Sequence, residues 1–142
     1  MKRILIMGLP GSGKTTLAMS LVGVLERAGK TITYLNADAV RELWDDWDFS
    51  VNGRIRQAQR MANYADESKN DYVIMDFVCP FPEMRAMVKP DYVIWMNTIE
   101  KSRYEDTNLL FDPPEKGSYD LKITSFKNAD AEKLWKTNLI SL

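Results

Sequence analysis

The stretch "ILIMGLPGSGKTTLA", from Ile4 to Ala18, decides the fold class of this chain. Its apolar start predicts a short buried strand, and apolar residues at helical spacing resume after the lysine. Between them, Gly8, Gly13, Lys14 and Thr15 fit the pattern G-x-x-x-x-G-K-[ST], with the strand before it and the helix after it that the motif requires. We therefore predict a phosphate-binding P-loop rather than a turn that merely joins strand to helix.

The residue types in this loop suit a nucleoside triphosphate. Glycine lets backbone N–H groups curl around phosphate oxygens, and the positive end of the following helix dipole faces the same anion. Lys14 is expected to reach the β- and γ-phosphates, and the Thr15 hydroxyl to ligate Mg²⁺. The nucleotide-binding residues expected in and beside the loop are Gly8, Gly11, Ser12, Gly13, Lys14, Thr15 and Thr16.

Length and composition set the class of protein. The 142 residues, 45% hydrophobic and 27% charged, predict one globular domain over residues 1–142. A formal charge of −1 gives no basic footprint for nucleic acid or a membrane surface. The first apolar run is too short for a signal peptide or a membrane span, and the one cysteine, Cys79, cannot form an internal disulfide, so we expect a cytoplasmic protein. The absence of histidine excludes histidine-based triads and metal sites.

Hydrophobic patterns along the chain alternate between the two kinds of element. Strands are expected at residues 3–7, 31–36, 71–78, 91–97 and 119–124, and helices at 14–28, 39–46, 52–69, 82–88 and 128–140, the last capped by Asn128. Residues 107–118 are expected to form a long loop. This alternation predicts an α/β fold of the P-loop NTPase type, a parallel sheet with helices on both faces.

Other sequence features narrow the class of P-loop protein. A GTPase normally carries N-K-x-D to read its base, and the nearest stretch, "NTIE" at Asn97–Glu100, does not fit. Motor-type ATPases usually end a strand in Asp-Glu, whereas Asp76 is followed here by Phe77. A small chain of this kind suits a kinase that phosphorylates a small molecule.

Two further stretches carry a family resemblance. "YLNADAVRELWDDWDFSVNGRIRQAQR" (Tyr34–Arg60) and "DFVCPFPEMR" (Asp76–Arg85) make the first 60% or so of the chain resemble the adenylylsulfate kinases, as a spaced series of matches. That family transfers the γ-phosphate of ATP to the 3′-hydroxyl of adenosine 5′-phosphosulfate (APS), giving PAPS, in sulfate assimilation. The resemblance implies ATP and Mg²⁺ as cofactors, an adenylate-kinase-like sheet order of 2-3-1-4-5, and the possibility of a homodimer.

The resemblance also implies roles for single residues. Asp38 takes the place of an aspartate beside Mg²⁺ and the attacking hydroxyl, so Lys14 and Asp38 are the expected catalytic residues. Arg103 and Asn108 fall at the ATP site, where Asn108 and the Asp112–Pro113 pair match positions that hold adenine. The acceptor-binding positions implied by the family pattern are Asp38, Arg41, Phe49, Arg54, Gln57, Val78 and Cys79.

The carboxylates have alternative interpretations. Asp38 lies at a strand end across from the P-loop, which suits Mg²⁺ or a substrate hydroxyl, but its place before "AVREL" also suits a helix N-cap. Asp76 stands where the family has a small or hydroxyl residue. It can be a second Mg²⁺ carboxylate or the partner of a nearby arginine. Asn36 and Ala37 replace the aspartate and glycine of the family pattern.

The arginines and aromatic residues have alternatives too. Arg54 and Gln57, three apart, share one face of a helix, and the other interpretation of Arg54 is a solvated side chain. Arg56 and Arg60 share another face, where they repel unless an acid lies between them. Phe49 can stack on a base or belong to the core. Trp44 and Trp47 are interpreted as packing residues or a pocket wall.

The lid is where the chain departs most from the family. The segment Glu100–Glu115 replaces a longer arginine-containing lid and offers Lys101 and Arg103 as nearby cations, while Leu109 replaces an aromatic that would sandwich the APS ring. We expect incomplete closure and some loss of ATP to water. Two alternatives to an APS kinase therefore stay open, a kinase for another small hydroxyl or nucleotide acceptor and a non-catalytic ATP-binding module.

Overall fold

A five-stranded parallel sheet forms the centre of the protein, seen here in a computed structural model that describes residues 1–142. The strand order is β2-β3-β1-β4-β5, and every neighbouring pair runs parallel. This confirms both the predicted α/β class and the predicted order 2-3-1-4-5. The strands are β1 (Lys2–Met7), β2 (Ile32–Asn36), β3 (Tyr72–Asp76), β4 (Tyr92–Met96) and β5 (Leu121–Ile123).

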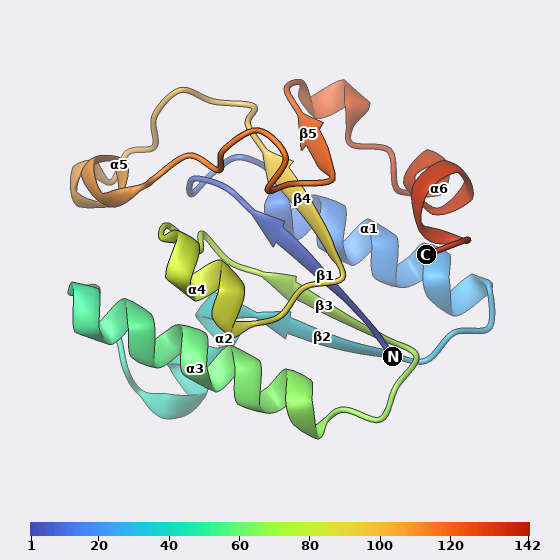
Figure 1. Ribbon diagram of the computed structural model, residues 1–142, viewed down its shortest axis with the longest axis horizontal. Coiled ribbons are helices and arrows are strands. Elements are labelled where there is room, and N and C mark those ends of the chain that lie inside the picture. The colour runs from blue at the N-terminus through green and yellow to red at the C-terminus, as the bar shows by residue number, and fades with distance from the viewer.

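Helices cover both faces of this sheet (Figure 1). Successive side chains of β1 point to opposite faces, so Ile4 and Ile6 join the buried cluster under α1 and α6, while Leu5 and Met7 join the cluster under α3 and α4. Burial on both faces explains why residues 4–7, 72–75 and 92–96 of the central strands are continuous apolar runs. The helices are α1 (Lys14–Arg27), α2 (Ala37–Trp44), α3 (Val51–Glu67), α4 (Pro82–Met87), α5 (Glu105–Leu110) and α6 (Ala131–Leu134).

The strand register brings three segments to one edge of the sheet. Asp76 at the end of β3 is level with Ile6 of β1 and with Asn36 of β2. The loop after β1, the start of α2 and the end of β3 therefore meet at the carboxyl ends of the strands, where ligands bind in open parallel sheets.

Three details differ from the sequence prediction. The C-terminal helix does not begin at Asn128, which ends the short 3-10 helix Phe126–Asn128. It begins at Ala131 and is capped by Asp130, whose carboxylate accepts from the Lys133 amide, and it continues as a π-helix over Trp135–Leu139. Helix α5 lies partly inside the expected loop. In the helix expected at 52–69, helical spacing puts Ile55 on one side with Ala58, Met61, Ala62 and Ala65, but Ile55 is 40% exposed whereas the other four are buried. None of the helices combines the length and the apolar character needed to cross a membrane.

Candidate active site

The glycine-rich loop runs between β1 and α1, and its backbone explains its glycines. Gly8 and Gly13 have φ of +149° and +96°, in the region that favours glycine. A Cβ on Gly8 would lie 2.5 Å from the Met96 carbonyl oxygen, and one on Gly13 would lie 3.1 Å from the Phe126 ring. The loop can therefore bend this tightly only without side chains at these positions.

Lys14 is held inside this loop. Its side chain is 8% exposed, and Nζ donates a hydrogen bond to the Leu9 carbonyl oxygen at 3.0 Å. Burial lowers the pKa of Lys14 below its ordinary 10.5, and the negative charges of Asp76 and Asp38 oppose this shift. The lysine is thus a cation with few partners, beside two carboxylates.

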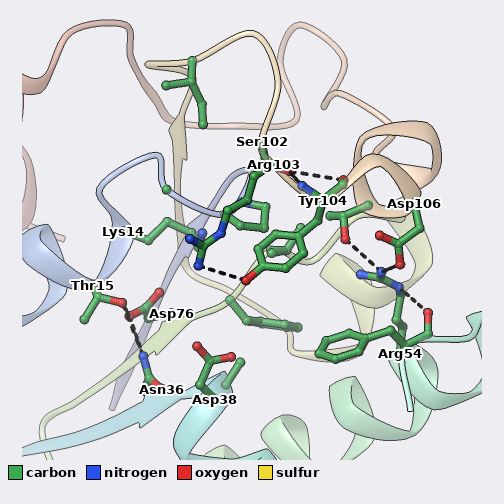
Figure 2. A pocket seen from close by; sticks show the side chains of 18 of the residues that line it. Lys14, Thr15, Asn36, Asp38, Arg54, Asp76, Ser102, Arg103, Tyr104 and Asp106 are labelled. Atoms are coloured by element: carbon green, nitrogen blue, oxygen red, sulfur yellow. Dashed lines mark hydrogen bonds and ion pairs between the residues drawn. The ribbon is translucent and has the colours of Figure 1, made fainter. Parts of the chain in front are cut away.

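Asp76 accepts hydrogen bonds from three side chains, of which Thr15 and Asn36 are labelled in Figure 2. Its Oδ2 accepts from Thr15 Oγ1 and Tyr34 Oη, both at 2.8 Å, and from Asn36 Nδ2 at 3.1 Å. The interpretation of Asp76 as the partner of an arginine is therefore wrong. Burial, together with the bond to this carboxylate, raises the pKa of Tyr34 to about 12. Asp76 joins the P-loop threonine to the end of β2.

A cavity of about 880 Å³ opens above these residues. It brings together the P-loop, the start of α2, the end of β3 and the segment from Ile99 to Thr107, so residues far apart in the sequence share one space (Figure 2). The residues predicted for the site that line it are Gly11, Lys14, Thr15, Asp38, Phe49, Arg54, Asp76, Val78 and Arg103.

Asp38 lines this cavity from the first turn of α2 and is not the helix cap. The cap is Asn36, whose Oδ1 accepts from the Ala39 amide at 3.0 Å. The alternative interpretation of Asp38 as an N-cap is therefore wrong. Because Asn36 takes over the capping bond, the Asp38 carboxylate stays exposed at the cavity wall.

Arg54 lies in the opposite wall and is not a solvated side chain. It is 4% exposed, and its Nε donates to the Phe49 carbonyl oxygen at 2.8 Å. Its Nη2 donates to Thr107 Oγ1 of α5 at 3.0 Å. Phe49 and Trp47 line the cavity next to it, with ring centroids 6.4 Å apart, so Trp47 belongs to the pocket wall.

Arg41 and Gln57 are buried but do not line the cavity. Arg41 Nη1 donates to the carbonyl oxygens of Asp46 and Asp48, and its guanidinium lies 4.3 Å from the centroid of the Phe49 ring. Gln57 Nε2 donates to the Ala37 carbonyl oxygen at 2.9 Å. The structure thus places both residues as supports of the α2–α3 connection, behind the wall that Phe49 forms.

The remaining arginines of α3 have an acid between them, as the sequence required. Asp46 Oδ2 accepts from Arg56 Nε at 2.7 Å and from Arg60 Nη2 at 2.6 Å. These bonds lower the pKa of Asp46 below its ordinary value. Trp44 packs nearby, with the Arg60 guanidinium over its ring and its Nε1 donating to Tyr64 Oη. This cluster belongs to the surface of α2 and α3.

The end of β3 contributes one side chain and hides the next. Val78 lines the cavity, whereas Cys79 is fully buried at a φ of +51°. Burial raises the pKa of the Cys79 thiol, and the Cys79 carbonyl oxygen accepts from Arg85 Nε. The structure does not bring the Cys79 side chain to the predicted acceptor site.

A second hollow, of about 440 Å³, lies on the other side of the P-loop. It shares Gly11, Lys14 and Thr15 with the first cavity and adds Gly13, Thr16, Leu17, Met96, Phe126 and Ala129. Phe126 was not among the residues predicted from the sequence. The sheet order could have indicated it, because the residues that follow β5 return to the side of the loop that follows β1.

Asn108 lines neither hollow. Its Oδ1 accepts from Ser102 N at 2.8 Å and from Ser102 Oγ at 2.7 Å, and its Nδ2 donates to the Ser102 carbonyl oxygen. The Asp112 amide donates to the Pro80 carbonyl oxygen beside α4. Asn108 therefore closes the loop from Ser102 to α5, and the Asp112–Pro113 pair packs away from the second hollow.

The short lid segment covers the first cavity. Its lining residues are Ile99, Lys101, Ser102, Arg103, Tyr104, Asp106 and Thr107. Arg103 Nη2 donates to Tyr104 Oη at 3.1 Å, and Figure 2 shows the Arg103 guanidinium directed toward Lys14. Two positive side chains thus face the same part of the cavity.

The protein resembles known kinases in sequence and in structure. It is 30% identical over 122 residues to the cytidine diphosphoramidate kinase of Campylobacter jejuni, covering 82% of this chain and 68% of that protein. It is 35% identical over 85 residues to a probable adenylyl-sulfate kinase of Aeropyrum pernix, covering 58% of this chain and 46% of that one. The chain thus spans about half to two thirds of these relatives.

The fold of the chain is also similar to that of a solved kinase. A Mycobacterium tuberculosis APS kinase, solved with AMPPNP and APS, superposes with a TM-score of 0.82 at 20% identity, over 99% of this chain and 98% of that one. The family model described as adenylylsulphate kinase matches residues 2–102, which include the P-loop, Asp38, Arg54 and Asp76. The chain belongs to the adenylylsulphate kinase family.

Proposed function

We propose that this protein transfers the γ-phosphate of ATP to the 3′-hydroxyl of APS, producing PAPS and ADP. The observation that supports this most is the shared cavity, in which the P-loop faces Asp38, Phe49 and Arg54 across one space. A kinase of this kind needs little covalent chemistry from the protein. It works by positioning both substrates and by neutralising charge.

ATP is proposed to span both hollows. Its phosphates take the P-loop, where they replace the Leu9 carbonyl oxygen as the partner of Lys14 Nζ. Its adenosine takes the second hollow against Phe126, an exposed ring beside Gly13. The two hollows share Gly11, Lys14 and Thr15, so a triphosphate lying on the loop reaches from one to the other.

Mg²⁺ fits the residues of this site. A magnesium ion in a kinase keeps several waters and phosphate oxygens and needs only one or two protein ligands. The structure holds no cluster of three or more acidic, histidine or cysteine side chains that would form a complete protein cage. Thr15, Asp38 and Asp76 would hold the ion, which when bound neutralises charge on the β- and γ-phosphates. Asp76 accepts the Thr15 hydroxyl hydrogen and Asn36 Nδ2 donates to Oγ1 at 3.4 Å, so one lone pair of Oγ1 remains for the metal.

The acceptor is proposed to bind on the α3 side of the cavity. Arg54 there offers a buried guanidinium to an anionic group, and Phe49 and Trp47 offer ring faces to a base. Asp38 then lies between the acceptor and the P-loop, in reach of the hydroxyl that attacks. Its role is to orient this hydroxyl and accept its proton, while Lys14 and Arg103 neutralise the negative charge on the transferred phosphoryl group.

Transfer of labelled phosphate tests this proposal. The protein is incubated with γ-labelled ATP, Mg²⁺ and APS, and the label is followed into PAPS, with Lys14→Ala as the inactive control. Cytidine diphosphoramidate serves as the comparison acceptor, since the Campylobacter relative is named for it. Labelled PAPS formed faster than any other product supports the proposal. Transfer of the label only to cytidine diphosphoramidate would identify that compound, rather than APS, as the acceptor. ATP binding without any transfer would indicate a binding module.

The proposed setting follows from the same family. We place the reaction in sulfate assimilation in the cytoplasm, carried out by one kinase domain over residues 1–142. A homodimer stays a prediction from the family resemblance, and equilibrium sedimentation would test it.

A further inference from the structure

Arg54 is shared between the acceptor wall and the lid. From α3 its Nη2 reaches Thr107 Oγ1 at 3.0 Å and Asp106 Oδ2 at 3.5 Å, both on α5 (Figure 2). The Asp106 side chain is 66% exposed, whereas Arg54 is almost fully buried. Arg54 therefore holds an exposed carboxylate in the same cavity that would receive an anionic acceptor.

The Asp106 carboxylate and an anionic acceptor would both need the same cation, the guanidinium of Arg54. A buried guanidinium is costly without a negative partner, and burial lowers the pKa of Arg54 while Asp106 opposes that shift. An acceptor phosphate that reaches Arg54 meets the Asp106 carboxylate at close range, and like charges there repel. Thr107, the other α5 partner of Arg54, is neutral and adds no charge that would repel an anionic acceptor.

We propose that Asp106 is a specificity residue that competes with the anionic group of the acceptor for Arg54. This rests on the proposed acceptor site. An acceptor with a strongly anionic group displaces the Asp106 carboxylate, which then turns into solvent. A neutral acceptor leaves the Asp106–Arg54 pair in place and gains nothing from Arg54. Asp106 thus makes occupation of Arg54 conditional on acceptor charge.

Binding to Asp106→Asn tests this competition. The protein, saturated with AMPPNP and Mg²⁺, is titrated calorimetrically with APS, with AMP and with adenosine. An exposed ion pair of this kind is worth up to about a fivefold change in an equilibrium constant, so Asp106→Asn should bind APS and AMP about fivefold more tightly. Adenosine should bind both proteins equally, and the gain should shrink as KCl is raised.

Glu105→Gln is the matched control. It removes the same charge from the neighbouring position of α5, and Glu105 contacts Asn108 at 3.4 Å rather than Arg54. If Glu105→Gln tightens APS binding as much as Asp106→Asn does, the effect is one of net charge and the competition is refuted. Equal affinity of wild type and Asp106→Asn for APS refutes it too.

A measurement without acceptor separates this inference from the proposed function. Hydrogen exchange of residues 105–110 in the free protein should be faster in Asp106→Asn than in wild type or Glu105→Gln, because the carboxylate helps hold α5. Unchanged exchange overturns the inference, whatever the acceptor. If wild type binds neither APS nor AMP while exchange responds as expected, the proposed acceptor fails and the contact between Asp106 and Arg54 stands.

Discussion

Replacing Asp76 by asparagine keeps the size of the side chain and removes the charge on which three donors converge. Thr15, Tyr34 and Asn36 all donate to Oδ2 of this residue, which is 2% exposed. A hydrogen bond to a charged group is roughly twice as strong as a neutral one, which is worth about 1 kcal/mol net. Asp76→Asn should therefore weaken each bond by about 1 kcal/mol.

Only part of this loss concerns the nucleotide. Removing a buried charge also removes its desolvation cost, so we expect the free energy of unfolding to fall by less than about 2 kcal/mol. The Thr15 bond is the one that orients a proposed metal ligand. Its weakening, with the lost attraction between carboxylate and Mg²⁺, should lower the magnesium-dependent part of ATP affinity about tenfold, or about 1.4 kcal/mol.

The assay compares ATP dissociation constants with Mg²⁺ and with EDTA, in wild type, Asp76→Asn and Tyr34→Phe. Tyr34→Phe removes one of the three donors and keeps the carboxylate, so its magnesium dependence should match that of wild type. If folded Asp76→Asn gains as much affinity from Mg²⁺ as wild type does, Asp76 does not help to hold the metal.

Three further predictions concern the loop and the lid. The pKa of Lys14 is lowered, so the lysine should lose its charge, and the protein its ATP affinity, as pH rises through a value below 10.5. Lys14→Arg stays charged and should abolish that loss in ATP-binding titrations from about pH 7 to 10.5. Gly8→Ala should cost clearly more thermal stability than Gly11→Ala, because only the first places a Cβ against a backbone oxygen, that of Met96, and equal melting temperatures would contradict this. The short lid should leak, so ADP formed per PAPS should exceed one at low APS and fall toward one at saturation, whereas a ratio of one throughout indicates complete closure.

The sheet was predictable because its signals are local. The three central strands each contain a continuous apolar run, as strands buried on both faces do, and the loop from Gly8 to Thr15 fixes one strand and one helix by itself. The sheet order came from the family resemblance, since spacing alone does not decide which strands are neighbours.

The sequence predicted several of the residues that line the site, but it did not predict what each side chain contacts. Lys14, Asp38 and Arg54 line one cavity as expected. Arg41 and Gln57, which share the same family pattern, bond to backbone oxygens behind the wall instead. A residue series cannot distinguish these outcomes, because the direction of each side chain depends on how α2 and α3 pack.

Contacts between distant segments were the hardest to foresee. The sequence offers an arginine or a metal as the partner of Asp76, and it does not indicate the hydrogen bonds from Tyr34 and Asn36 of β2, which depend on the strand register. Phe126 reaches the P-loop only because β5 is the edge strand beside β4. These contacts depend on the tertiary arrangement, and nothing in the local sequence indicates them.

Both substrates are proposed to meet between Lys14 and Asp38, and a single-turnover measurement on Asp38→Asn tests this arrangement most directly. ATP and APS are mixed with excess enzyme, quenched at intervals and analysed for PAPS, with Glu42→Gln as an exposed acidic control on the same helix. Removing a group that orients the hydroxyl and takes its proton costs about a hundredfold or more in rate. We predict such a loss of rate with the dissociation constants of ATP and APS nearly unchanged, and transfer at the wild-type rate in Asp38→Asn would contradict the proposed role of Asp38.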